Sequence, residues 1–74
     1  MVDSSFDKIP ILVNGQGKTC RSGTLLPVFL ESLGLNPRLI AVEYNGEILH
    51  RQLWATTRLH PHDKLEIVTI VGGG

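Results

Sequence analysis

The 74-residue sequence predicts a small α+β domain in which one helix packs across one face of a four- or five-stranded sheet. Two Asn-Gly dipeptides, Asn14-Gly15 and Asn45-Gly46, each separate two β-forming runs, as in tight hairpin turns. Between the two hairpins lies one segment with apolar residues at helical spacing, and the last run, KLEIVTIV, is typical of a strand. A single helix must bury its apolar stripe against the sheet, which gives two layers.

The first hairpin is expected to combine residues 9–14, IPILVN, with the return strand KTCR at 18–21. The preceding residues 1–8 are polar and unpatterned, so we expect a flexible N-terminal extension and an ordered domain that begins at Ile9 and extends to residue 71.

The helix is predicted from an apolar stripe that recurs at i, i+3, i+4 and i+7. We expect Thr24 to cap its first turn, where Pro27 is tolerated because the missing N–H would have no intrahelical partner. Gly34 can take the left-handed conformation that ends a helix. The stripe comprises Leu26, Phe29, Leu30 and Leu33.

The second half of the sequence predicts a third strand in LIAVEY, a short return strand in EIL, and a final strand after the HPHD turn. The segment RQLWATTRL fits a single helical turn or an irregular crossing. In the final strand Leu65 and Ile67 share one face and Glu66 takes the other. Beyond them Val68, Ile70 and Val71 put apolar groups on both faces, so we predict that these three dock onto a partner protein.

Length and composition exclude several classes of function. Seven Lys and Arg residues balance seven Asp and Glu residues, so there is no basic surplus for binding nucleic acid or an anionic membrane. No run approaches the roughly 18 apolar residues that cross a membrane, and the first residues lack the pattern of a secretory signal. One cysteine, Cys20, cannot form an internal disulfide. We expect a cytoplasmic protein that is a monomer on its own.

The end of the sequence places Gly72, Gly73 and Gly74 directly after a β-branched run. Ordering a glycine costs about 1–2 kcal/mol of backbone entropy, so these residues do not stabilise the fold. From residue 71 onward an extended tail without Cβ atoms spans roughly 10–14 Å and fits a narrow channel. We therefore predict a flexible reactive tail at 72–74, in which Gly72 and Gly73 thread into a partner and the Gly74 carboxylate reacts.

Five stretches together resemble the ThiS family, the ubiquitin-like β-grasp sulfur carriers of thiamine biosynthesis that end in Gly-Gly. They are LVNG at 12–15, SGTL at 22–25, VEYNGEILHRQLW at 42–54, HDKLEI at 62–67 and the terminal GG. The resemblance covers about residues 9–74 and implies a β-grasp fold with a mixed sheet. Two features depart from the family pattern: the third glycine, Gly72, and the extension at residues 1–8.

The resemblance also implies a chemistry for the tail. A ThiF-like adenylating enzyme would use ATP to convert the Gly74 carboxylate into an acyl-adenylate, because a carboxylate oxygen is a poor leaving group. A cysteine-desulfurase-type donor would supply sulfur, leaving a thiocarboxylate that thiazole synthase, ThiG, takes as its sulfur source. The chain itself would then bind no cofactor and act as a protein substrate, not an enzyme.

Alternative functions stay open at this point. The MoaD-type small subunit of molybdopterin synthase usually carries a Pro-Pro pair before its diglycine, where this chain has Thr69-Ile70-Val71. Another ubiquitin-like carrier or modifier is possible, although ubiquitin has arginines in its tail where apolar residues stand here. A plain β-grasp interaction module would not need the last two glycines.

The remaining candidate residues are assigned structural roles. His60 and His62, with only His50 as a further histidine, supply too few ligands for a zinc site. Cys20 is predicted to be a small packing residue of a strand, and Trp54 to complete the edge of the core. No catalytic set with a nucleophile, a base and an orienting group can be placed in the sequence.

Overall fold

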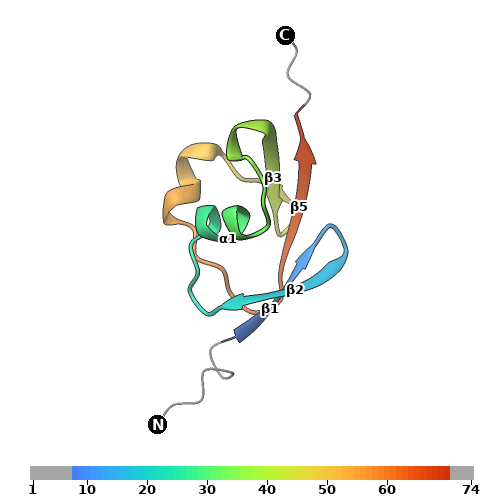
Figure 1. Ribbon diagram of the computed structural model, residues 1–74, viewed down its shortest axis with the longest axis vertical. Helices are drawn as coiled ribbons and strands as arrows, with labels where there is room; N and C mark the ends of the chain where they lie inside the picture. The colour runs from blue at the N-terminus through green and yellow to red at the C-terminus, as the bar shows by residue number, and fades with distance from the viewer. Residues whose placement is uncertain (1–7, 71–74) are drawn as a thin grey trace.

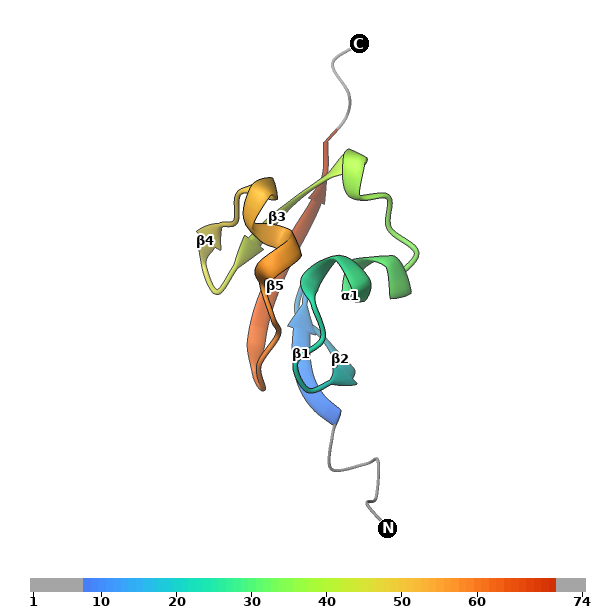
Figure 2. The same cartoon turned by 90° about the vertical axis from the view of Figure 1, so that its left-hand side faces the viewer.

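The computed structural model describes residues 8–70, which form one mixed five-stranded sheet and one α-helix. The strands lie in the order β2-β1-β5-β3-β4, with β4 and β2 at opposite edges (Figure 2). Strand β5 is central, parallel to β1 and antiparallel to β3. This confirms the predicted α+β sheet with one helix. The bounds are β1 Lys8–Val13, β2 Gln16–Arg21, α1 Leu26–Ser32, η2 Pro37–Leu39, β3 Ile40–Tyr44, β4 Glu47–Ile48, η3 Arg51–Thr56 and β5 Asp63–Thr69, where η2 and η3 are 3-10 helices.

Both predicted hairpins are confirmed. Asn14 and Gly15 have φ angles of 50° and 81°, and Asn45 and Gly46 have φ angles of 52° and 90°. Two successive residues with positive φ match the twist of the flanking strands, which explains why Asn-Gly stands at each turn. The turns join antiparallel β1 to β2 and β3 to β4. Strand β1 starts one residue before the expected Ile9, because Lys8 already pairs with Arg21.

The helix carries Leu26, Phe29 and Leu30 of the predicted stripe as buried residues, whereas Leu33 is its C-cap and only partly buried. The start of the helix also differs from the expectation. Thr24 does not cap the first turn: α1 begins at Leu26, and the Thr24 hydroxyl instead donates to the Arg21 carbonyl. The N–H of Leu26 is satisfied by the Thr57 carbonyl at 2.8 Å, so a distant segment replaces the local cap. Gly34 follows the last turn with a φ of 76°, as predicted.

The core lies between α1 and the sheet face that it covers, with η3 on the same side of β5 as α1 (Figure 1). Leu65 and Ile67 point into this core while Glu66 is exposed, as the alternation of β5 predicts. The buried apolar residues are Ile9, Ile11, Val13, Leu26, Phe29, Leu30, Ile40, Val42, Trp54, Leu59, Leu65 and Ile67.

The ambiguous segment at 51–59 contains the short 3-10 helix η3, which packs against α1. Trp54 in η3 is buried and donates its indole N–H to the Leu49 carbonyl at 3.0 Å, so its predicted structural role is confirmed. Within residues 8–70, no helix has both the length and the apolar character needed to cross a membrane.

Candidate functional site

Strand β5 carries the residues that lead to the predicted reactive tail. After β5 ends at Thr69, the backbone N–H of Ile70 donates to the Leu39 carbonyl at 2.6 Å, so the chain stays attached to the β3 side of the sheet. Val68 is 60% exposed and Ile70 is 45% exposed. Val71 and the three glycines, Gly72, Gly73 and Gly74, lie outside the described residues. The docking role of Val71 and the threading and reactive roles of the glycines stay predictions.

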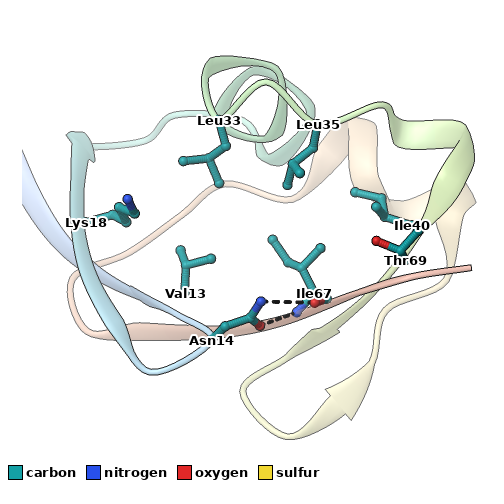
Figure 3. A pocket seen from close by; sticks show the side chains of 8 residues that line it. All are labelled: Val13, Asn14, Lys18, Leu33, Leu35, Ile40, Ile67 and Thr69. Carbon is teal, nitrogen blue, oxygen red and sulfur yellow. Dashed lines mark hydrogen bonds between the residues drawn. The ribbon is translucent and has the colours of Figure 1, made fainter.

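Asn14 fixes the second half of β5 in a way that the sequence did not reveal. The β1–β5 ladder pairs Ile11–Val13 with Asp63–Leu65 and stops where the hairpin turns away. There the Asn14 side chain takes over, accepting from the Ile67 N–H at 2.7 Å and donating to the Ile67 carbonyl at 3.0 Å (Figure 3). The side-chain amide thus satisfies the backbone groups of Ile67 as one more residue of a neighbouring strand would.

The outer face of the sheet is the face away from α1, and it is more apolar than solvent exposure alone requires. Ile48 on β4 is 72% exposed, and Leu12 on β1 and Val68 on β5 are also exposed. A shallow hollow of about 180 Å³ lies between β3, β4 and β5 on this part of the sheet. Its lining comprises Ala41, Val42, Glu43, Ile48, Glu66 and Val68.

A second cleft, of about 290 Å³, opens between the end of α1 and the β1–β2 hairpin. Figure 3 shows Leu33 and Leu35 above it and Val13 and Ile67 below it. Its lining mixes apolar side chains with the polar residues Asn14, Lys18 and Thr69, and its volume falls at the lower limit of typical small-molecule pockets, which hold about 300–1,000 Å³. Its position at the open end of the core makes it a gap between the two layers of the fold.

Asp63 is the buried carboxylate of the described chain, and its hydrogen bonds explain the HPHD turn. It accepts from the Tyr44 hydroxyl at 2.5 Å, the His60 backbone N–H at 2.7 Å and the Asn45 amide at 3.2 Å. Burial and this carboxylate together raise the pKa of Tyr44 to about 12. His62 has a φ of 71°, so the turn is tight. These groups join β5 to the β3–β4 hairpin.

The other titratable candidates have structural surroundings. Residues 8–70 contain no cluster of three or more His, Cys, Asp or Glu that could hold a metal ion. Cys20 is half-buried on edge strand β2, where burial raises the pKa of its thiol. A raised pKa lowers the thiolate fraction at neutral pH, which fits a packing residue better than a reactive one.

Arg51 and Trp54, which contribute to the resemblance, hold the fold together. The Arg51 guanidinium lies 4.6 Å from the centroid of the Trp54 ring and donates to the carbonyls of Pro37 and Ile40. It therefore connects η3 to η2 and to the start of β3. This is a cation–π contact combined with hydrogen bonds to carbonyl groups at a chain reversal. The contacts of both residues are therefore with the fold itself, and they assign neither residue to a docking surface.

A comparison with family models identifies the family of this chain. The model of the ThiS family matches residues 11–74. A protein of Porphyra purpurea, named uncharacterized protein ycf40, is 39% identical over 66 residues, which cover 89% of this chain and 93% of that protein. The ycf40 protein of Pyropia yezoensis is 41% identical over the same shares.

Two further similarities concern thiamine proteins. The crystal structure of a thiamine biosynthesis protein, ThiS, from Geobacter metallireducens matches with a TM-score of 0.78 and 28% identity, covering 89% of this chain and 100% of that chain. A thiazole synthase of Paramagnetospirillum magneticum is 34% identical over 64 residues. That match covers 86% of this chain and 20% of the synthase, so the similarity concerns one segment of a much longer protein.

Proposed function

Since this chain belongs to the ThiS family and is a thiamine-related sulfur carrier, we propose that the Gly74 carboxylate is the atom group that carries the sulfur. A ThiF-like enzyme transfers the AMP moiety of ATP to this carboxylate and releases pyrophosphate. The persulfide of a donor of the cysteine-desulfurase type then attacks the acyl-adenylate, so that AMP leaves and an acyl disulfide joins the carrier to the donor. A thiol cleaves this disulfide and forms a new disulfide with the donor sulfur, which leaves the thiocarboxylate on Gly74. The chain is a protein substrate in each step, because the groups that perform the chemistry belong to its partners.

The observation that carries this proposal is that the family model extends through residue 74, so the match includes the three terminal glycines as well as the folded domain. The fold supports it through the position of β5. This strand is central, is held on both sides and leads to the tail from an exposed end. A rigid body with a narrow terminal segment can place one carboxylate inside another protein's active site.

The proposed consumer of the sulfur is a thiazole synthase of the ThiG type. Segments of the thiazole synthases of Paramagnetospirillum magneticum and Magnetococcus marinus are each 34% identical to this chain and make up 20% of those proteins. A carrier-like segment and a thiazole synthase in one polypeptide are held at high effective concentration, which is useful when one acts on the other. This supports the assignment of the synthase as a partner of the separate chain.

The proposal is tested by intact-mass measurement of the carrier after incubation with the adenylating enzyme, ATP and a sulfur donor. We expect a mass gain of one sulfur-for-oxygen exchange on the wild type. Adding one alanine after Gly74 should abolish the gain, whereas adding one alanine before Met1 gives a control of equal mass that still reacts. Both variants should unfold at the wild-type temperature.

Two results would contradict the proposal. One is sulfur transfer to the variant with the added C-terminal alanine. The other is a mature protein, isolated from cells, whose intact mass shows that the chain continues beyond Gly74 in its working form. The first result would remove the threading argument, and the second would remove the terminal carboxylate as the reactive group.

A further inference from the structure

The outer face carries two carboxylates directly opposite each other. Glu43 on β3 and Glu66 on β5 are paired residues in the antiparallel ladder, and both are exposed. Side chains of paired residues on one face start about 5 Å apart at their Cβ atoms. The next partner of Glu43 is Ile48 on β4, so the two carboxylates lie within an apolar surround.

No cation of the described chain lies within 4.0 Å of this pair. Among residues 8–70, the ion-pair contact found within 4.0 Å is His60 with Asp63, which lies at the HPHD turn and does not involve Glu43 or Glu66. Lys64 is on the same face, two residues before Glu66, yet its ammonium lies farther than that from both carboxylates. Like charges directly opposite each other destabilise a sheet. The pair therefore does not serve the stability of the isolated domain.

The carboxylates restrict what can cover the outer face. Exposed Val68 and Ile48 favour contact with an apolar partner surface. A purely apolar surface would also remove water from Glu43 and Glu66 without replacing its hydrogen bonds, and burying unpaired charges costs more than the apolar contact returns. A surface that binds here must therefore bring a positive group to the centre of the contact.

We propose that the Glu43–Glu66 pair receives an arginine side chain of the adenylating enzyme, inserted into the hollow between β3, β4 and β5. This inference rests on the proposed function, which supplies the enzyme as a partner. The planar guanidinium has five N–H donors and can bond to two carboxylates at once. Ile48 and Val68 then pack against the surface around the arginine, and they exclude water from the ion pairs.

The test uses the full-length carrier and the purified adenylating enzyme, with Kd measured by calorimetry. Glu43→Gln and Glu66→Gln keep the side-chain shape and remove one charge each. We expect each to weaken binding about 30-fold or more, because the arginine loses a carboxylate inside the contact. Glu31→Gln, at an exposed position of α1, removes the same charge away from the outer face and should bind like the wild type.

Two further measurements separate recognition from folding. Thermal unfolding of Glu43→Gln and Glu66→Gln should occur at or above the wild-type temperature, because each change relieves repulsion between the carboxylates. Wild-type binding should also weaken between about 0.05 M and 0.5 M salt, and less so in the glutamine variants. A lowered unfolding temperature would mean that the pair has a structural role, and this would overturn the proposal.

The outcomes also distinguish this inference from the proposed function. If the wild type gains sulfur and the glutamine variants bind as tightly as Glu31→Gln, the proposed arginine contact is refuted and the proposed carrier function stands. If the wild type gains no sulfur with active partners, the proposed function is contradicted, whatever the glutamine variants bind. Binding that is weakened only in Glu43→Gln and Glu66→Gln, together with normal sulfur transfer at high enzyme concentration, supports both.

Discussion

Both faces of the sheet carry apolar residues, but only those of the inner face are buried in the core. On the inner face Val42 and Leu65 are 1% and 0% exposed, beneath α1 and η3. On the outer face Val68, on β5 like Leu65, remains exposed, and so does Ile48 on β4, which pairs with β3. A sheet with one covered face needs apolar residues on that face alone. The outer apolar residues are not needed for the core, which supports the proposal that they dock onto a partner protein.

The largest expected effect comes from a change on the inner face. Leu65→Ala removes a fully buried side chain from the centre of β5 and should lower the free energy of unfolding by about 2–5 kcal/mol. Urea unfolding followed by circular dichroism measures this value. A loss below about 1 kcal/mol would contradict the assignment of the inner face as the core.

The next largest effect is expected at Asn14, whose side chain connects the β1–β2 turn to Ile67 of β5. Asn14→Ala removes both bonds to Ile67 and places alanine at a φ of 50°, so we expect a loss of about 2–3 kcal/mol. Asn14→Gly tolerates the positive φ and loses only the bonds, so it should cost less than the alanine variant. Equal losses in urea unfolding would show that the bonds alone account for the effect.

Asn14 also marks the boundary of what could be predicted from the sequence. Both Asn-Gly turns, the helix stripe and the alternation of β5 depend on neighbouring residues, and these predictions are confirmed. The bonds between Asn14 and Ile67 join residues 53 positions apart, and the sequence pattern contains no signal for them. The misplaced cap at Thr24 has the same cause, because the distant Thr57 carbonyl satisfies the first turn.

The candidate site divides in the same way. The glycine tail is visible as a local motif, and the prediction that Val68 and Ile70 dock onto a partner follows from the strand pattern. The Glu43–Glu66 pair is not visible, because it depends on the register between β3 and β5. The sequence pattern marks Asp63 only as part of a turn, although it is a buried acceptor of three hydrogen bonds. Register and burial arise only when distant segments meet.

A smaller effect is expected at Tyr44, whose hydroxyl donates to buried Asp63. Tyr44→Phe should lower the free energy of unfolding by about 1–2 kcal/mol at neutral pH, because Asp63 loses a donor. In the wild type the pKa of Tyr44 is raised to about 12 in the folded state, above its ordinary value. The unfolded chain then releases the phenolic proton first, so the stability from this bond is complete below about pH 10 and is lost as pH rises toward 12.

The difference between wild type and Tyr44→Phe isolates this contribution from other groups that titrate in alkali. Urea unfolding at several pH values between about 8 and 12 should show the two stability curves converging as pH rises. Parallel curves would mean that the hydroxyl does not hold its proton for Asp63, and the network at the HPHD turn would need another explanation.

The smallest expected effect on stability makes the sharpest test of the two faces, because one chemical change can be made on each. Val42 and Val68 lie on adjacent strands, one inward and one outward. Threonine keeps the branched shape of valine and adds a hydroxyl. Val68→Thr should change the free energy of unfolding by less than about 0.5 kcal/mol, whereas Val42→Thr buries the hydroxyl and should cost about 1–3 kcal/mol.

Binding to the adenylating enzyme should reverse this order, since only Val68→Thr alters the proposed docking surface. If Val68→Thr destabilises the fold as much as Val42→Thr, the outer face serves folding as well, and the apolar residues around Glu43 and Glu66 no longer point to a partner.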